Sequence, residues 1–425
     1  MNNRKTNRME SDGARESVQA FYNLHPYPPP VEDLGSYRQR WQDETRRRAD
    51  FHLHWPDKAY RADLKVLVAG CGTSQAAKYA LRQPASQVVG IDISTTSIRH
   101  TQALKRKYKL SNLEVYQLPV ERAAELGCCF DKIVCTGVLH HLPDPEAGLR
   151  ALGAVLEPDG VMHLMVYAAY GRAGIYMLQE YCRRLGIGYT DPEIQELAQT
   201  LAALPPHHPL RRLLGESPDF HSKAGLADAL LHPQDRAYTV PQLFEFIEDS
   251  GLRFSRWVRQ APYMPSCGSL AETPHAARLA KLPQKEQYAA LELFRGTMLR
   301  HNLIVYRDNN SRDLPHFDNN GWLVYVPVRL PEAISVQQRL PPGAAAVLIN
   351  QNHTDPDLAL PVSASQLQLF EAINGKRSMA EIIDQVSLSG GGIPSQLHEP
   401  ARSFFEKIWW HDQVVFDASR KADSL

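Results

Sequence analysis

A glycine-rich loop, Gly70-Cys71-Gly72, is the first feature of the sequence that suggests chemistry. It follows the apolar run VLVA, and glycine at both ends allows a tight turn with no Cβ between the backbone and a ligand. Such a loop after a strand is typical of proteins that bind a nucleotide or another adenosine-containing ligand. The dinucleotide pattern G-x-G-x-x-G needs a third glycine where this chain has Gln75, and the phosphate-binding pattern G-x-x-x-x-G-K-[ST] is absent. These departures count against NAD and ATP as ligands, and the alternative for the loop alone is an ordinary strand-to-helix turn.

An acidic residue follows this loop at the distance expected of a ribose ligand. Asp92 ends the second apolar run, VVGID, about twenty residues after the loop. A carboxylate accepts two hydrogen bonds from a diol, which suits ribose hydroxyls. The alternative is that Asp92 only caps the helix that begins near Thr95. We favour ribose binding, because the loop and the acid occur together at this spacing.

Short apolar runs alternate with helical stretches around these two motifs. The first predicted strands are 65–69, 87–91, 113–118, 132–136 and 161–167. Helical stretches such as 96–108 and 145–156 lie between them, and this alternation predicts a parallel sheet with helices on both faces.

The same pattern resumes after a helical insertion at 171–233. A helix over 241–250 and strands at 252–258 and 302–306 complete an α/β domain over 64–307, preceded by a tail and cap segment over 1–63. Within that segment, the first seventeen residues are expected to be disordered and a short helix is expected at 17–24.

The last hundred or so residues form a different predicted unit, over 315–420. Strands are predicted at 322–328 and 414–416, with three amphipathic helices between them. Three helices with flanking strands predict a small α+β, winged-helix-like accessory domain.

Four segments of the first domain resemble, in order, the core motifs of class I S-adenosylmethionine-dependent methyltransferases. They are GCGTS, GIDIS, FDKIVCTGVLHHLPDP and LEPDGVMHLMVYA. The resemblance implies a Rossmann-like, seven-stranded, mostly parallel sheet whose last strand is antiparallel. It also implies that S-adenosylmethionine is the cofactor and lies across the strand tips.

The resemblance assigns cofactor contacts residue by residue. Gly70, Cys71 and Gly72 would contact the methionine part of the cofactor, Asp92 would hold the ribose, and Ile93 would pack on the adenine. Beneath the cofactor would lie Thr136, Gly137 and Val138. The chain departs from the family pattern at three positions. The family often has an acid where this chain has Val68, a glycine at Ser74 and a second acid at Pro119. Glu121, shifted from the last of these positions, is the candidate for the adenine amino group.

The acceptor side is predicted from segments that overhang the sheet. The candidates for catalysis are His140, His141 and Tyr167, with a base needed only where the acceptor loses a proton. The segment FYNLHPYP predicts a lid that contains Tyr22 and Tyr27. Further substrate-facing candidates are Tyr170, Arg172, Arg236 and Tyr238. Each has the alternative of a packed, capping or surface residue, and the spacing of Cys and His residues predicts no metal site.

Composition narrows the partners and the compartment. Lys and Arg number 47, as do Asp and Glu, and this zero net charge counts against nucleic acid or an anionic membrane as partner. The six cysteines form no C-x-x-C pair. No apolar run approaches the roughly 18 residues of a membrane span, and the polar N-terminus does not resemble a signal peptide. We therefore expect a cytoplasmic protein.

Together these features predict an S-adenosylmethionine-dependent methyltransferase that acts on a small molecule or a protein side chain by in-line transfer. In the last domain, LFEAINGKRSMAEIID resembles the small peptide-binding domain of pyrroloquinoline quinone biosynthesis, which implies a peptide partner. The alternative there is a dimerisation or scaffolding domain. The alternative for the whole chain is a catalytically inactive binding or regulatory protein. The acceptor and the oligomeric state are left open.

Overall fold

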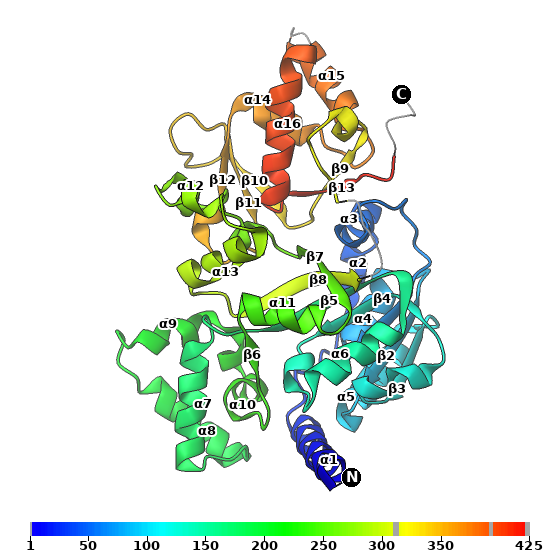
Figure 1. Cartoon of the computed structure of the whole chain (residues 1–425), viewed down its shortest axis with the longest axis vertical. Coiled ribbons are helices and arrows are strands. Elements are labelled where there is room, and N and C mark those ends of the chain that lie inside the picture. The colour runs from blue at the N-terminus through cyan, green and yellow to red at the C-terminus, as the bar shows by residue number, and fades with distance from the viewer. Residues whose placement is uncertain (1, 309–313, 391–393, 421–425) are drawn as a thin grey trace. The chain divides into compact units, whose positions relative to one another are not determined.

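Two compact units make up the chain. The computed structural model describes residues 2–308, 314–390 and 394–420 (Figure 1). The first unit contains Met1–Arg38, Asp63–Phe254 and Gly296–Asp308, and the second contains Gln39–Ala62, Ser255–Arg295 and Asn309–Leu425. This division differs from the predicted boundaries, because part of the 1–63 segment and residues 255–295 of the predicted first domain group with the C-terminal part.

The first unit is built on one sheet of eight strands. Its order is β3-β2-β1-β4-β5-β8-β7, and β6 pairs with β5. In chain order the strands are β1 (Lys65–Ala69), β2 (Gln87–Asp92), β3 (Leu113–Gln117), β4 (Phe130–Thr136), β5 (Leu156–Ala168), β6 (Ala237–Tyr238), β7 (Leu252–Trp257) and β8 (Arg300–Arg307). The first six pair in parallel, and β8 runs antiparallel to β5. The predicted Rossmann-like, mostly parallel sheet is thus confirmed, with β6 as a short additional strand.

Burial explains why the central strands read as unbroken apolar runs. Residues 66–69 of β1 are all buried, because helices cover both faces of a parallel sheet. These helices are α4 (Gln75–Arg82), α5 (Thr95–Tyr108), α6 (Pro145–Ala154) and α11 (Val240–Glu248), with the short turns η1 (Val120–Leu126) and η2 (Leu139–His141). The carboxyl ends of parallel strands share one edge, so the loops after β1, β2, β4 and β5 lie together.

The N-terminal segment is more ordered than its composition suggests. The structure has one helix, α1 (Asn2–Leu24), where disorder was predicted for the first seventeen residues. Gln19 Nε2 of this helix donates to Ile93 O at 2.9 Å, and Arg15 forms an ion pair with Glu121. A polar sequence is helical here because it is held by the tips of the sheet, which its own periodicity does not reveal.

The insertion after β5 is helical, as predicted. It contains α7 (Ala173–Leu185), α8 (Asp191–Ala202), α9 (Pro209–Glu216), η3 (Pro218–His221) and α10 (Lys223–Leu231). Its core joins Ile175, Ile194 and Leu226, from three of these helices, to Phe21 of α1. This packing fixes α10 beside the N-terminal helix.

The second unit combines two small antiparallel sheets with helices. The sheets are β10-β11-β12, from β10 (Ala333–Val336), β11 (Ala346–Asn350) and β12 (Leu360–Val362), and β13-β9, from β9 (Val326–Arg329) and β13 (Val414–Asp417). The longer helices are α3 (Glu44–His54), α13 (Gln284–Arg295), α14 (Ala364–Glu371), α15 (Met379–Gly390) and α16 (Pro394–Trp410).

Shorter elements connect these parts. They are α2 (Gly35–Arg40), η4 (Ala261–Tyr263), η5 (Ser269–Glu272), α12 (Ala276–Leu279), η6 (Asn320–Val324) and η7 (Pro356–Leu358). Helix α3 belongs to this unit because it packs on β9 and β13, with Ala49 buried against Val328 and Val415.

The predicted helices of the C-terminal module are present, whereas its strands differ in part. The strand expected at 322–328 begins as the turn η6, and the sheet β10-β11-β12 was not predicted. The winged-helix likeness and the peptide partner stay predictions. No helix among the described residues has the length and apolar character that a bilayer crossing requires.

Candidate active site

The loop after β1 is closed by contacts that only glycine permits. Gly70 has φ +66° and Gly72 has φ +54°. A Cβ added at Gly70 would lie 2.2 Å from Val138 Cγ2, so the loop after β1 and the loop after β4 touch at this point. Cys71 is fully buried, and burial raises the pKa of its thiol well above the ordinary value. Cys71 is therefore a protonated packing residue, and the backbone of the loop is what faces a ligand.

Asp92 ties the first two loops together. Its Oδ2 accepts the Gly72 N–H and its Oδ1 accepts the Ser94 N–H, both at 2.8 Å. Burial raises the pKa of this carboxyl, and the N–H donors of Ser94 and Gly72 oppose that shift. A carboxylate offers about four lone-pair positions, so capacity to accept from a ribose hydroxyl remains. The cap of α5 is Ser94, whose side chain accepts the Ser97 N–H, and this removes the main alternative for Asp92.

The residue that breaks the dinucleotide pattern has a structural contact of its own. Gln75 Nε2 donates to Thr136 Oγ1 at 2.8 Å, which links the start of α4 to the end of β4. Gly137 follows with φ +77°. Thr136, Gly137 and Val138 thus lie beside the glycine loop, and their place beneath a cofactor stays a prediction.

Glu121 has an unused acceptor at the other end of this site. One oxygen pairs with Arg15 at 3.4 Å, and Oε2 is buried with no partner among the described residues. A buried carboxylate oxygen without a donor favours a ligand that brings one, such as an adenine amino group. Ile93 directly follows Asp92, and its carbonyl accepts a hydrogen bond from Gln19 Nε2.

The N-terminal segment covers the loops as the predicted lid would. Ser94 Oγ donates to Asn23 Oδ1 at 3.0 Å, and Thr96 Oγ1 donates to Asn23 O at 3.1 Å. Thr73 Oγ1 donates to Pro28 O at 2.9 Å on the glycine loop. The segment from α1 to the prolines therefore spans from the β2 tip to the β1 tip.

A second group of polar side chains lies beyond the tips of β4 and β5. Asp228 of α10 is buried, and its two oxygens accept hydrogen bonds from Tyr22 Oη at 3.0 Å and from Tyr167 Oη at 3.2 Å. Burial and the nearby Asp228 carboxylate raise the pKa of both tyrosines well above the ordinary value. Both phenols are therefore hydrogen-bond donors rather than bases at neutral pH.

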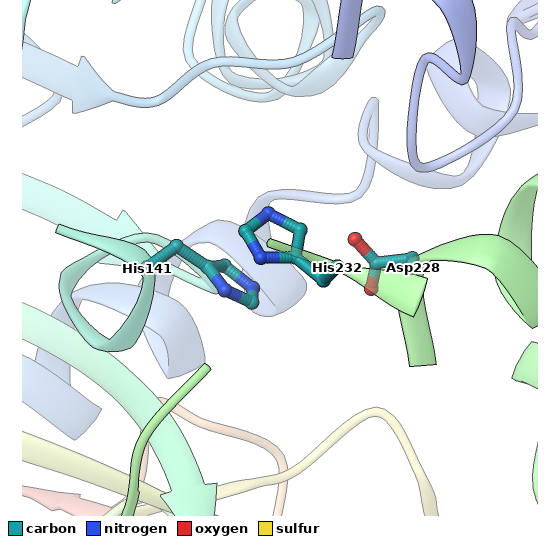
Figure 2. Close-up of side chains that lie close together, drawn as sticks. All are labelled: His141, Asp228 and His232. Carbon is teal, nitrogen blue, oxygen red and sulfur yellow. The ribbon is translucent and has the colours of Figure 1, made fainter. Parts of the chain in front are cut away.

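The two adjacent histidines have different surroundings. His140 is completely buried, stacks on Tyr167 with ring centroids 3.8 Å apart, and has no hydrogen-bond partner for either nitrogen among the described residues. Burial lowers its pKa well below 6.5, so it is neutral. His141 Nδ1 lies 2.7 Å from Gln234 O, and its ring lies 3.9 Å from that of His232 (Figure 2). His141 is thus the histidine of the pair that takes part in a polar cluster.

The remaining acceptor-side candidates lie partly inside and partly outside this cluster. Arg172 is buried, places its guanidinium 3.4 Å from the Tyr167 ring centroid and pairs with Asp235 at 3.4 Å. Tyr27 Oη donates to Asp219. Tyr170 is exposed, and Arg236 forms a surface ion pair with Glu146. Tyr238 is buried and stacks on Phe246. The structure brings Tyr22, His140, His141, Tyr167 and Arg172 together and leaves Tyr170, Arg236 and Tyr238 outside the cluster.

The sequence analysis missed the residues that α10 contributes. These are Asp228, His232 and Asp235, polar residues in a segment whose sequence looks like an ordinary helix and the loop that follows it. The available signal was the four-residue spacing of Asp228 and His232, which puts both on one helical face. That signal is weak until the fold places His141 beside them.

Comparison with known proteins agrees with the fold. Residues 67–162 match the family described as a methyltransferase domain. PKMT2 from Rickettsia typhi, solved in complex with AdoHcy, shares the fold with a TM-score of 0.64 at 16% identity, covering 92% of this chain and 77% of that one. The first unit therefore has the class I methyltransferase fold, and S-adenosylmethionine is the cofactor of this class.

A more similar relative covers most of the chain. An uncharacterized protein of Synechococcus sp. is 30% identical over 340 residues, which are 75% of this chain and 78% of that protein. The chain belongs to the same family as this protein. The ubiquinone biosynthesis O-methyltransferase of Acinetobacter baylyi is 27% identical over 146 residues, and the match covers 32% of this chain and 61% of that enzyme. The chain thus spans about three fifths of that relative's length.

Proposed function

We propose that the chain transfers the methyl group of S-adenosylmethionine to a nucleophilic atom of a small molecule or a protein. The observation that carries this proposal is the position of Tyr22. Its main-chain oxygen lies 3.2 Å from Ser94 Oγ, beside Asp92, and its phenol donates to Asp228. One residue thus contacts both the cofactor loops and the polar cluster, which supports a donor and an acceptor site side by side.

On the cofactor side, the chain's own residues bind and orient. The backbone of Gly70, Cys71 and Gly72 would back the methionine part, Asp92 would accept the ribose hydroxyls, and Glu121 Oε2 would accept the adenine amino group. When bound, the cofactor supplies a methyl group already activated by its sulfonium. The protein then aligns donor and acceptor and excludes water. The lid, whose residues Asn23 and Pro28 contact the cofactor loops, is suited to this role.

On the acceptor side, the three catalytic candidates take different roles. His140 and Tyr167 form a stacked wall, with Tyr167 anchored to Asp228. His141 donates from Nδ1 to Gln234 O, because a carbonyl can only accept, and in this tautomer the lone pair of the ring is on Nε2. We assign His141 as the polar contact to the acceptor and Tyr22 and Arg172 as positioning residues. The cytoplasm, expected from the sequence, remains the proposed compartment.

Transfer of labelled methyl from S-adenosylmethionine in a cell extract tests the proposal. We expect label in the protein or small-molecule fraction, dependent on the wild-type chain and strongly reduced by Asp92→Ala. Binding of S-adenosylmethionine without any transfer would instead support the inactive regulatory alternative, which the departures at Val68, Ser74 and Pro119 keep open. Label in RNA alone would contradict the proposed acceptor classes.

A further inference from the structure

Three metal-ligating side chains meet at the acceptor side of the first unit. His141 follows β4, whereas Asp228 and His232 come from α10 and its C-terminal cap, about ninety residues later in the chain (Figure 2). One candidate ligand atom from each residue lies within 4.8 Å of the other two. His141 and Asp228 are buried and His232 is 9% exposed, so the cluster is largely screened from solvent.

The hydrogen bonds of His141 prepare it as a ligand. Its Nδ1–H donates to Gln234 O at 2.7 Å, which fixes the tautomer and leaves the Nε2 lone pair available. Histidines that bind metals commonly donate their other ring N–H to a main-chain carbonyl or a carboxylate in this way. This contact therefore orients His141 as the outer contacts of metal sites do.

Asp228 has the outer contacts of a ligating carboxylate. Its two oxygens accept hydrogen bonds from Tyr22 and Tyr167, and each oxygen retains a lone pair. Phenol donors of this kind orient a carboxylate without neutralising its charge. An anionic carboxylate buried among neutral donors is stabilised further by a cation, because neither phenol compensates the charge.

His232 supplies an unpartnered nitrogen. Its Nε2 is buried and has no hydrogen-bond partner among the described residues, while Nδ1 accepts the Gln234 N–H at 3.0 Å. In the free neutral ring the proton is on Nε2. Coordination through Nε2 requires this proton to move to Nδ1 and the Gln234 contact to open. Opening that contact gives up one neutral hydrogen bond, which is small beside the free energy of binding a metal ion through three side chains.

From this arrangement we propose that His141, Asp228 and His232 form a binding site for a divalent transition-metal ion. Two imidazoles and one carboxylate match the ligand preference of Zn²⁺, and three protein ligands leave a coordination position open. Bonds of about 2.0 to 2.1 Å put two ligand atoms of a tetrahedral site about 3.3 Å apart. The three atoms therefore close by no more than about 1.5 Å, within reach of side-chain rotation.

The role of such an ion rests on the proposed function, although its binding does not. An ion at this position would hold the acceptor's oxygen or nitrogen beside Tyr22 and favour loss of the acceptor's proton. His141 would then contact the acceptor through the ion rather than directly. The sequence analysis predicted no metal, because the three ligands come from segments whose proximity only the fold creates.

Zinc binding to the full chain tests the proposal. Chelator-treated protein is dialysed against Zn²⁺, and bound metal is counted by mass spectrometry while the Kd is measured by titration calorimetry. We expect one zinc per chain and a Kd raised roughly 100-fold or more by His232→Ala and by Asp228→Asn. The outer-contact variant Tyr22→Phe should raise the Kd about 10- to 100-fold. His207→Ala, an exposed histidine of the same insertion, is the matched control and should leave the Kd unchanged.

Other outcomes decide against the site. Zinc bound equally well by His232→Ala and Asp228→Asn, or no stoichiometric zinc in the wild type, overturns the proposal. Binding of S-adenosylmethionine is measured on every variant to show that the fold persists, and His232→Gln replaces His232→Ala if the latter does not fold. Retained cofactor binding without zinc refutes only the metal site, whereas zinc binding without cofactor binding refutes only the proposed function.

Discussion

Replacing Gly70 by alanine tests whether the loop after β1 must lack a side chain. Two costs apply, a positive φ of +66° and a Cβ 2.2 Å from Val138 Cγ2, where real Cβ contacts stay above 3.0 Å. The left-handed conformation costs an alanine about 1 to 2 kcal/mol, and overpacking costs about 1 to 3 kcal/mol. Gly70→Ala should therefore lower the free energy of unfolding by about 2 to 5 kcal/mol. The displaced loop should also weaken S-adenosylmethionine binding at least about tenfold.

Gly127 provides a matched control, because its φ is +65° and a Cβ there would meet nothing within 4 Å. Gly127→Ala should show only the conformational cost and normal cofactor affinity. Val138→Ala in the Gly70→Ala background should recover part of the loss, with a coupling of about 0.5 to 3 kcal/mol. Urea unfolding and titration calorimetry measure both effects. Equal destabilisation by Gly70→Ala and Gly127→Ala would refute the steric reasoning, as would unchanged cofactor affinity of Gly70→Ala.

Three further predictions concern buried titratable side chains. Asp92→Asn should raise the Kd for S-adenosylmethionine about 10- to 100-fold, since a hydrogen bond to a charged group contributes about 1.5 to 3 kcal/mol; calorimetry showing unchanged affinity would refute the ribose role. Burial lowers the pKa of His140, so its contribution to stability is present above the ordinary pKa of 6.5 and is lost as pH falls toward the folded-state value. His140→Phe should therefore flatten the pH dependence of urea unfolding between pH 7.5 and 5.5, by up to about 1.4 kcal/mol per pH unit, and an unchanged slope contradicts this. Arg172→Ala should cost about 3 to 5 kcal/mol by leaving Asp235 buried without its cation, and Asp235→Asn in that background should recover part of it; strictly additive losses would exclude the coupling.

The sheet was predictable because its signals are local. Each central strand is an apolar run bounded by glycine or a helix start, and the positions of Gly70 and Asp92 follow from that pattern. The order of α1 was not predictable, since a polar helix forms there through contacts with Ile93 and Glu121. The placement of α3 with β9 and β13 was not predictable either, because only packing in the fold brings these segments together.

The cofactor side of the site was more accessible to sequence reasoning than the acceptor side. Loop glycines and the acid after β2 have fixed spacing, whereas the acceptor cluster joins residues about ninety positions apart. His140 and His141 looked equivalent in the sequence, and only the fold separates a stacked, unpartnered ring from one that contacts Gln234. Asp228 carried only the weak signal of its four-residue spacing from His232, although both Tyr22 and Tyr167 converge on it.

Calorimetric titration of the whole chain with S-adenosylmethionine, its demethylated product and NAD tests the central claim most directly. The account predicts saturable binding of one molecule of S-adenosylmethionine or of the product per chain, and no saturable binding of NAD. Saturable binding of NAD with no binding of S-adenosylmethionine would contradict it.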